Sequence, residues 1–367
     1  FYRNKLQKRR TRRFRATSWH TRTKQRKNDE IFKIGENMNN YLRISEFIAN
    51  KNNEKILFTA GPASLLEENV LGLQPCFGRG DDNYNKTEES VLQKLKEMSG
   101  HKNIARMQGS GSLGLEVMAS NFLYGKVLVI QSGYYSQRLL ELSKFAQLQF
   151  REIKEVSEAD WTDLESIQGS YDWIFACYTE TSIGLKLDIK QLRQAADKAG
   201  AKLMIDATAS IGLETNHELA DVLSYSSCKG LFGLTGAAFV SFNGNPKIEV
   251  KSFYLSLENH LNKKMTGPYH SIASLELVLE NHDDFLFSVI KNKETCLEKF
   301  EEHLKWRPEN QPLLCTFINQ KIIAYDERAI LYSPRSNLKG SVVCHLGEVH
   351  LGKGSTAEAI KSLGVEK

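Results

Sequence analysis

Two charged residues stand in stretches where chemistry is possible. Lys229 lies in SYSSCKGLFGLTGAAFV (224–240), after a polar run and before a glycine-rich apolar loop. A lysine in tight, mostly apolar surroundings can form a Schiff base, although a surface lysine in a turn is the commoner case. Asp206 ends the apolar run KLMID, where a carboxylate needs a cationic partner, caps a helix or forms an ion pair. Asp206 lies 23 residues before Lys229, which leaves room for a helix and a strand, so that both side chains can reach one ligand.

A glycine-rich turn, GSGSLG at residues 109–114, matches the G-x-G-x-x-G pattern of dinucleotide-binding loops. Such a loop needs a good strand before it and an acidic residue at the end of the next strand. The preceding HKNIARMQ is half polar, and the next apolar run ends in QSGYY without a carboxylate, which disfavours NAD. Ser110, Gly111 and Ser112 at the start of a helix suit one terminal phosphate, or they form a plain serine-capped turn.

Two further loops offer side chains for a flat aromatic ligand. Thr181, in CYTETSIG, can hydrogen-bond a ring hydroxyl, and Tyr135, in QSGYYSQR, can stack on a ring face. Each loop follows an expected strand, and in open α/β sheets ligands bind beyond the carboxyl ends of the strands. Together with Lys229 and Asp206, these residues indicate pyridoxal 5′-phosphate (PLP), because they supply a phosphate cup, a ring clamp, a ring-nitrogen partner and a Schiff-base lysine.

Alternating apolar runs and helical patterns must position these side chains. Buried strands are expected at 127–131, 173–178, 202–206 and 237–242, with helices at 112–124, 136–146 and 189–200. This alternation is typical of a doubly wound, mostly parallel α/β sheet. Beyond about residue 250, the pattern predicts helices over SIASLELVLENH and 284–304 and short strands near 313–324 and 341–346, which favours a smaller α+β unit.

The expected organisation is a basic tail or linker (1–54), a large α/β domain (55–250) and a small α+β domain (251–367), with a cofactor between the two domains. Of the 49 Lys and Arg, twelve lie in residues 1–28 without any Asp or Glu, so the rest of the chain is net acidic. Such a tail can bind nucleic acid, but no groove-reading motif surrounds it. We favour a poorly ordered linker, and a start at Phe1 is compatible with a fused domain upstream.

Composition narrows the class of protein. Apolar residues make up 41% and charged residues 25% of the chain, as is usual for soluble globular proteins. No run of about 18 apolar residues is present, so no membrane span is expected. The six cysteines lack C-x-x-C spacing, which argues against a zinc or other metal site and against a disulfide framework. Reduced thiols in a cytoplasmic enzyme are the better interpretation.

Seven short motifs share one family pattern: FTAGP (58–62), GSGSLGLEVM (109–118), SGYYSQR (132–138), TETSIG (179–184), DATASIG (206–212), SSCKGLFG (226–233) and TGPYHSI (266–272). Through them, residues 55–352 resemble the class V aminotransferases of PLP fold type I. The resemblance is closest to the branch of 2-aminoethylphosphonate–pyruvate and alanine–glyoxylate aminotransferases. It implies that Lys229 carries the cofactor and that Asp206 pairs with the ring nitrogen, with the other residues in the roles given above.

Two positions outside the cofactor loops matter for the resemblance. Thr266 falls where the family often sends a phosphate contact from the neighbouring subunit, which implies a homodimer with shared active sites. Near the C-terminus the family usually carries an Arg two residues before a Gly, where it holds the substrate carboxylate or phosphonate. In SVVCHLGEVHLG (341–352), His345 stands at that position. A neutral imidazole cannot replace a bidentate, permanent cation. Either Arg335 or another cation substitutes, or the substrate differs, or the alignment slips by a few residues.

The predicted function is a PLP-dependent transaminase that moves an amino group from a small amine or amino acid to a keto acid such as pyruvate or glyoxylate. The donor is expected to resemble 2-aminoethylphosphonate, alanine or serine. One alternative is a PLP-dependent lyase or desulfurase on the same fold. A desulfurase needs a reactive cysteine in an exposed Gly/Ser-rich loop, which we do not find. The other alternative is a binding protein with a vestigial PLP site, which the intact Lys229 and Asp206 disfavour.

Overall fold

The structure is a computed structural model that describes residues 44–73, 78–346 and 355–366. Ile48–Lys367 form one compact unit, and the following account concerns this unit. The basic stretch 1–28 and Cys76 lie outside the described residues.

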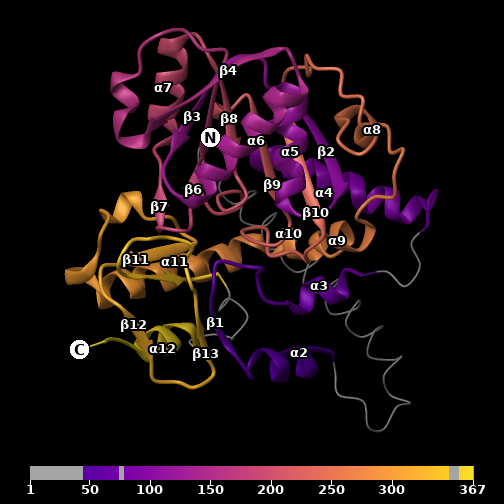
Figure 1. The fold of residues 1–367 in the computed structure, drawn as a ribbon. Helices are drawn as coiled ribbons and strands as arrows, with labels where there is room; N and C mark the ends of the chain where they lie inside the picture. Colours follow the sequence, from indigo (N-terminus) through magenta and orange to yellow (C-terminus); the bar gives the residue numbers. More distant parts are fainter. Residues whose placement is uncertain (1–43, 74–77, 347–354, 367) are drawn as a thin grey trace, which may run out of the picture. The chain divides into compact units, whose positions relative to one another are not determined.

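A seven-stranded sheet lies at the centre of this unit (Figure 1). Its spatial order is β2 (Asn103–Gln108), β10 (Ala237–Phe242), β9 (Val222–Ser226), β8 (Lys202–Asp206), β5 (Trp173–Cys177), β3 (Gly125–Gln131) and β4 (Ile153–Asp160). β10 runs antiparallel to both of its neighbours, whereas the other neighbouring pairs are parallel. The predicted mostly parallel α/β sheet is therefore confirmed, and the four expected strands are β3, β5, β8 and β10.

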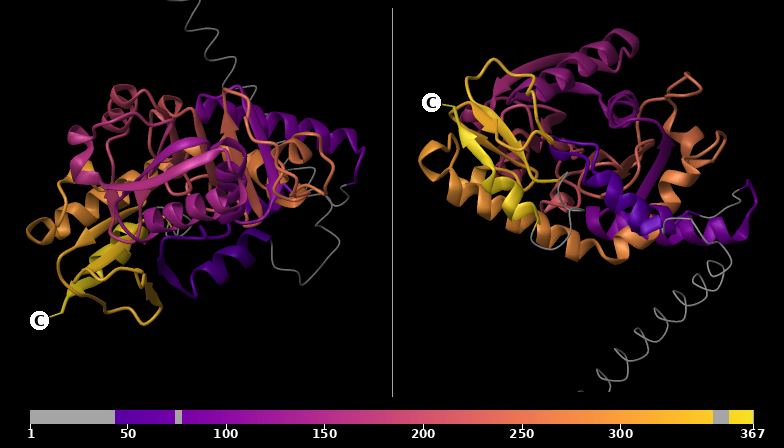
Figure 2. Two further views of the ribbon diagram at one scale, coloured as in Figure 1. Left: turned by 45° about the horizontal axis from the view of Figure 1, so that its top comes forward. Right: turned by 90° about the horizontal axis from the view of Figure 1, so that it is seen from below.

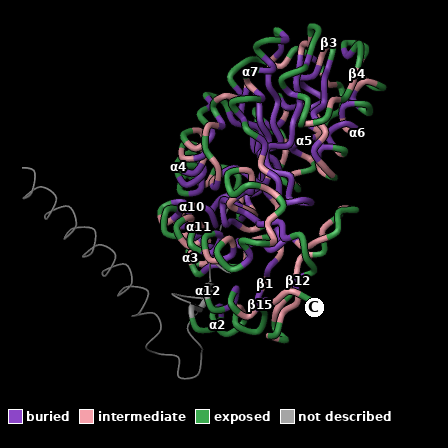
Figure 3. Tube along the Cα trace, turned by 90° about the vertical axis from the view of Figure 1, so that its left-hand side faces the viewer, coloured by how far each residue is buried: buried purple, intermediate pink, exposed green. Residues whose placement is uncertain are grey.

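Both faces of the sheet are covered, which makes three layers (Figures 1 and 2). Along β3, Val127 and Val129 pack with helices α5 (Gly111–Phe122) and α6 (Tyr134–Gln149), while Leu128 and Ile130 pack in the cluster that includes α4 (Asp82–Ser99) and α7 (Ile189–Ala199). Successive strand side chains point to opposite faces, so a strand buried on both sides is apolar throughout. The buried segments in the centre of Figure 3 include these strands.

The long helices have defined ends. The Asp188 carboxylate accepts a hydrogen bond of 2.8 Å from Lys190 N–H and caps α7, which ends at Gly200 in the left-handed region (φ 68°). α4 is built in the same way, between the cap Asp81 and Gly100 (φ 70°). Each helix thus spans the sheet and returns the chain to its amino edge for the next strand.

The C-terminal part of the chain is divided between two places. α8 (Leu257–Leu261) packs against β2 and α5, and α9 (Tyr269–Ala273) and α10 (Leu275–Glu280) pack against α4, whereas α11 (His282–Lys299) and α12 (Ser355–Lys361) pack against each other in a smaller layer (Figure 1). Its strands form three short pairs: β11 (Cys315–Ile318) with β14 (Ser341–Cys344), β12 (Ile322–Ala324) with β15 (Leu363–Val365), and β13 (Ala329–Leu331) with β1 (Ile56–Phe58). The pairing of β1 with β13 brings an N-terminal segment into this layer, whereas the division at residue 250 stays a prediction.

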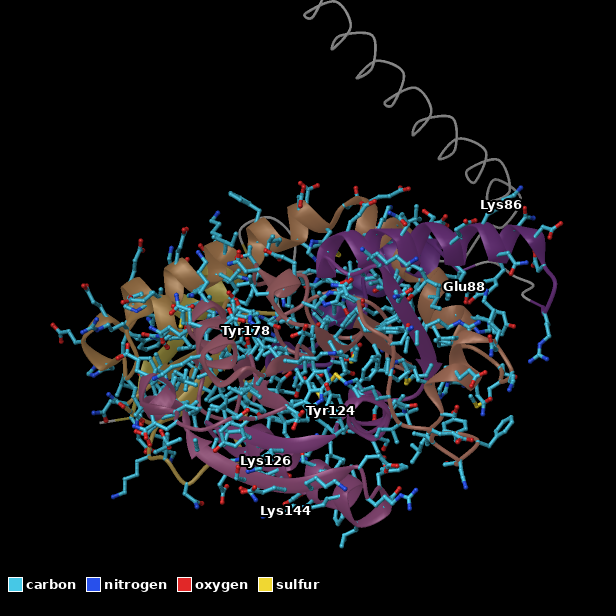
Figure 4. All side chains as sticks on the ribbon, turned by 90° about the horizontal axis from the view of Figure 1, so that it is seen from above. Lys86, Glu88, Tyr124, Lys126, Lys144 and Tyr178 are labelled. Carbon is cyan, nitrogen blue, oxygen red and sulfur yellow. The ribbon has the colours of Figure 1, made fainter. Side chains whose placement is uncertain are left out.

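One segment differs from the sequence analysis. HKNIARMQ was judged a poor strand, yet it contains β2, in which Ile104–Met107 are buried. Arg106 is tolerated there because its Nε lies 2.6 Å from Oε1 of Glu88, which projects from α4 (Figure 4). A buried charge with such a partner no longer opposes strand formation. The expected helix over SIASLELVLENH is divided between α9 and α10, which meet at Ser274.

Candidate active site

The site is a cavity of about 290 Å³ beyond the carboxyl ends of the parallel strands. Five loops reach it, after β2, β3, β5, β8 and β9, and Arg335 joins them from the segment between β13 and β14. The predicted residues that line it are Gly111, Ser112, Tyr135, Thr181, Asp206, Lys229 and Arg335. The fold therefore brings together most of the predicted site, although the role of each residue stays a prediction.

Asp206 is the last residue of β8 and faces Cys177, the last residue of β5. Its side chain is buried, and Oδ1 accepts a hydrogen bond of 2.9 Å from Thr208 N–H. Oδ2 lies 4.0 Å from Cys177 Sγ, and no Lys or Arg forms an ion pair with this carboxylate in the described part of the chain. Burial first, and then the charge of Asp206, raise the pKa of Cys177. Asp206 thus lacks the cationic partner that a buried carboxylate needs.

Lys229 follows β9 and extends into the cavity, with Nζ 5.6 Å from the centroid of the Tyr135 ring. The stem is held by the segment around Gly61. A Cβ on Gly61 would lie 3.2 Å from Lys229 Cγ, and the φ of Gly61 is +126°, so only glycine fits there without strain. Ala63 N–H donates to Cys228 O at 2.7 Å and fixes the same segment. The FTAGP motif therefore serves to position Lys229.

The N-terminus of α5 presents its first turn to the cavity through Gly111 and Ser112. The first N–H groups of a helix have no partner within the helix, so they are available to an anion. A Cβ on Gly111 would lie 3.2 Å from Thr208 Oγ1, which makes this approach of backbone to loop close. Ser110 is the exposed N-cap residue and does not line the cavity.

Three hydroxyls support the interpretation of the cavity as a ligand site. The Oγ1 atoms of Thr179, Thr181 and Thr208 are buried, line the cavity and have no hydrogen-bond partner. Buried polar groups are nearly always paired, so such atoms require an explanation. A ligand that is cationic next to Asp206, polar next to these hydroxyls and anionic at α5 satisfies all of them. PLP has these features, and Lys229 is placed to bind its aldehyde, so the residues fit this cofactor.

Tyr135 is fixed through the start of α6. Oε2 of the buried Glu180 accepts hydrogen bonds from the N–H groups of Tyr135 and Ser136, both at 3.0 Å. Glu180 Oε1 also accepts from Ser182 Oγ and Ser182 N–H. One carboxylate thereby ties the helix that carries Tyr135 to the loop that carries Thr181.

Two other predicted residues lie away from the cavity. His345 follows β14 and is fully buried, with Nδ1 2.9 Å from Leu313 O and Nε2 3.2 Å from Thr316 Oγ1. Burial lowers the pKa of His345 to about 4, so the ring is neutral near pH 7. Thr266 is exposed, in the segment before α9. Neither residue lines the cavity, and their roles as substrate and cofactor ligands stay predictions.

Further residues that line the cavity were not predicted from the sequence, and Arg138, Cys177 and Thr208 are among them. Arg138 stands in the quoted stretch SGYYSQR, one helical turn after Tyr134, and this i, i+4 spacing placed it on the same face of α6. Thr208 lies two residues after Asp206 in DATASIG. Within the residues described, no group of His, Cys, Asp or Glu is arranged to hold a metal ion. The helices described there include none that is long and apolar enough to span a membrane.

Solved structures with the same architecture define the class of protein. An aspartate aminotransferase of Thermus thermophilus superposes with a TM-score of 0.70 at 19% identity, over 83% of this chain and 96% of its own. An alanine–glyoxylate aminotransferase of Nostoc sp. gives 0.70 at 18% identity, over 84% and 94%. The fold is therefore that of the PLP fold type I aminotransferases.

The family follows from the sequence comparisons. Residues 79–258 match the family model of aminotransferase class V. A 2-aminoethylphosphonate–pyruvate transaminase of Pseudomonas aeruginosa is 26% identical over 254 residues, which cover 62% of this chain and 68% of that protein. A Pseudomonas putida protein of the same name is 25% identical over 257 residues, which cover 63% and 70%. The comparisons thus place the resemblance with the class V aminotransferases, as the motifs predicted, and the chain is a transaminase.

Proposed function

We propose that the chain binds PLP in this cavity and transfers the amino group of a small amine to a keto acid such as pyruvate or glyoxylate. The donor would be 2-aminoethylphosphonate or a similar compound, or a small amino acid such as alanine or serine. The observation that carries the proposal is the cavity itself, where Lys229 and the unpaired Asp206 lie with three unpartnered hydroxyls and the N-terminus of α5. The similarity to 2-aminoethylphosphonate–pyruvate transaminases of Pseudomonas supports the choice of donor.

Each of these residues would contact a different part of PLP. Gly111 and Ser112 would take the phosphate, Tyr135 would cover one face of the ring, and Thr181 would bond the ring hydroxyl. Asp206 would accept the ring N–H, and Lys229 would form the Schiff base. When bound, PLP supplies an aldehyde for amines and a protonated ring that accepts electron density from the substrate Cα.

The chain supplies the proton transfers. Lys229 Nζ is the amine in the cavity, and once released by the substrate it would take the proton from the substrate Cα. Asp206 would stabilise the positive charge on the ring nitrogen of PLP, and this charge makes the Cα proton more acidic. Since donor and acceptor would use the same cavity in turn, we expect ping-pong kinetics.

We also propose a homodimer and a cytoplasmic location. The exposed Thr266 supports the dimer, since it is free to reach a second subunit rather than its own cavity. The thiols of Cys177, Cys296, Cys315 and Cys344 are buried and free, which supports a reducing compartment.

The first experiment is a visible absorption spectrum of the purified chain with PLP, followed during additions of 2-aminoethylphosphonate, alanine, serine and glutamate. We expect a band of lysine-bound PLP that one amine converts to the pyridoxamine form. Lys229→Ala should lose this band and reduce turnover at least a thousandfold, while Lys126→Ala, at an exposed position on β3, should keep both. Near-normal turnover in Lys229→Ala would refute the assignment. Release of sulfide from cysteine would favour a desulfurase, and failure to bind PLP would favour a vestigial site.

A further inference from the structure

Two guanidinium groups lie on one side of the cavity and come from distant parts of the chain. Arg138 projects from α6, and Arg335 lies in the segment between β13 and β14. Tyr134 stands between them. The Arg138 and Arg335 Cζ atoms are 5.6 and 5.3 Å from the centroid of the Tyr134 ring, and Arg335 Nη1 donates to Tyr134 Oη at 3.2 Å. Hydrogen bonds from Arg138 and Arg335 also hold the pKa of Tyr134 below its usual value.

Neither guanidinium has a carboxylate partner among the described residues. The two arginines that are largely buried outside the cavity differ in this respect, since Arg106 pairs with Glu88 and Arg193 pairs with Asp197 and Asp221. Arg138 instead donates to the Ser112 hydroxyl at 3.2 Å. The lining of the cavity thus combines Arg138, Arg335 and Lys229 with Asp206 as its one carboxylate. This excess of positive charge favours a ligand that carries more than one anionic group.

The position of Arg335 separates this charge from the cofactor phosphate. In the proposed arrangement, that phosphate lies at the N-terminus of α5, beside Ser112. Arg138 donates to Ser112 Oγ and lies over the Tyr134 ring, whereas Arg335 donates to Tyr134 Oη; among the described residues, only Arg138 of this pair bonds Ser112. The pair therefore extends from the phosphate cup into the part of the cavity left for substrate.

Because His345 is not a cation, the binding of an anionic substrate group needs a positive charge from another residue. The family places an arginine there, but this histidine is buried, neutral near pH 7 and bonded to Leu313 O and Thr316 Oγ1. Recognition of a permanently anionic substrate group then needs a guanidinium from elsewhere. Two guanidiniums match a tetrahedral dianion better than a single carboxylate, because each can give two parallel hydrogen bonds to it.

We propose that Arg138 and Arg335, held in place by Tyr134, form an anion clamp that binds the doubly charged phosphonate of the amino donor and takes over the role of the missing family arginine. The inference rests on the proposed function for the identity of the amine, but the clamp makes its own prediction about anion binding. Arg138 and Arg335 would touch the substrate, while Tyr134 would be a positioning residue.

The test compares amines with one carbon skeleton and different end groups: 2-aminoethylphosphonate (dianion), taurine and β-alanine (monoanions) and ethanolamine (uncharged end). The rate of the amine half-reaction is measured from the cofactor spectrum. Wild type should have its highest kcat/KM for the phosphonate. Arg138→Gln and Arg335→Gln should each lower this value about 10- to 100-fold, as expected for the loss of hydrogen bonds to a charged group, while ethanolamine changes less than about threefold. Arg151→Gln, at an exposed position, is the matched control.

A second measurement does not depend on turnover. Calorimetric titration of methylphosphonate into the PLP-loaded chain should show affinity that falls at least tenfold in Arg335→Gln and stays constant in Arg151→Gln. Tyr134→Phe should raise KM for the phosphonate severalfold with kcat unchanged. The clamp is refuted if the phosphonate-to-ethanolamine ratio is the same in all variants, or if Arg138→Gln and Arg335→Gln lose PLP instead, since the arginines would then serve the cofactor phosphate.

Failure of the proposed function gives a different result. If wild type binds no PLP, the transaminase proposal fails, and the methylphosphonate titration is made on the chain alone. A tenfold loss of affinity confined to the Arg138 and Arg335 variants would then still support an anion clamp, and equal affinity in all variants would overturn it.

Discussion

The buried ion pair between Arg106 of β2 and Glu88 of α4 allows a direct test of how the outer strand of the sheet is held. Arg106 Nε lies 2.6 Å from Glu88 Oε1, and the two side chains are 7% and 2% exposed. Glu88 Oε2 pairs with Lys263, and Oε1 also accepts a hydrogen bond of 3.2 Å from Tyr84 Oη. Arg106→Met keeps an apolar stem of similar length but leaves this buried carboxylate with fewer partners.

The structure fixes the expected size of the effect. Removing one member of a buried ion pair costs about 3–5 kcal/mol, whereas an exposed pair contributes about 0–1 kcal/mol. Because Lys263 and Tyr84 still bind Glu88, we expect the lower end, about 3 kcal/mol, which is roughly a hundredfold in the unfolding equilibrium. The control is Lys321→Met, which breaks a 2.7 Å pair with Glu366 whose side chains are 70% and 47% exposed. That variant should lose less than about 1 kcal/mol.

The effect of Arg106→Met should depend on pH in a defined direction. Burial alone would raise the pKa of Glu88, but the bonds from Lys263 and Arg106 hold it below its ordinary value of 4.5. A carboxyl with a lowered folded-state pKa stabilises the fold above its unfolded pKa, and this stability is lost as pH falls through the folded pKa. The difference between wild type and Arg106→Met should therefore be constant from pH 7 to about 5.5 and narrow below about 4.5.

The assay is urea unfolding followed by both near- and far-ultraviolet circular dichroism, because coincident transitions justify a single free energy of unfolding. The double variant Glu88→Gln/Arg106→Met should lose less stability than Arg106→Met alone, since no buried charge remains. The reasoning would be wrong if Arg106→Met and Lys321→Met lost equal stability. The reasoning would also be wrong if Glu88→Gln/Arg106→Met were less stable than Arg106→Met alone.

Two further predictions concern the site. Asp206→Asn should still bind PLP but slow the amine half-reaction about 100- to 1,000-fold, because an amide cannot balance the charge of the ring nitrogen. An unchanged rate in single-turnover absorption measurements would contradict the role of Asp206. His345→Arg, which restores the family residue, should destabilise the chain by about 3–5 kcal/mol in thermal unfolding without raising affinity for the phosphonate, because it buries a cation without an acidic partner. A stable variant with tighter phosphonate binding would show that residue 345 does reach the substrate.

The sequence predicted the sheet where its strands are apolar on both faces. The runs at β3, β5, β8 and β10 were recognisable because helices cover both sides of the sheet, and no charged residue stands at their central positions. β2 was missed because Arg106 stands within it, and its charge is balanced by Glu88, which lies 18 residues earlier in the chain. The hydrophobic periodicity of a short segment gives no information about an ion-pair partner at that separation.

The sequence also predicted most of the residues that line the cavity, because Lys229, Asp206 and the glycine loop each lie in a short motif at or just after the end of a strand. Parallel strands end at one edge of a sheet, so motifs of this kind meet there whatever lies between them. The sequence named His345 and Arg335 as candidates for substrate binding but could not decide between them. Burial and two hydrogen bonds keep His345 out of the cavity, whereas tertiary packing brings Arg335 to Tyr134, 201 residues away in the chain, beside Arg138. A short motif can be recognised from the sequence because its residues are neighbours in the chain. The charge of the cavity, in contrast, depends on which distant side chains the fold brings there without an acidic partner.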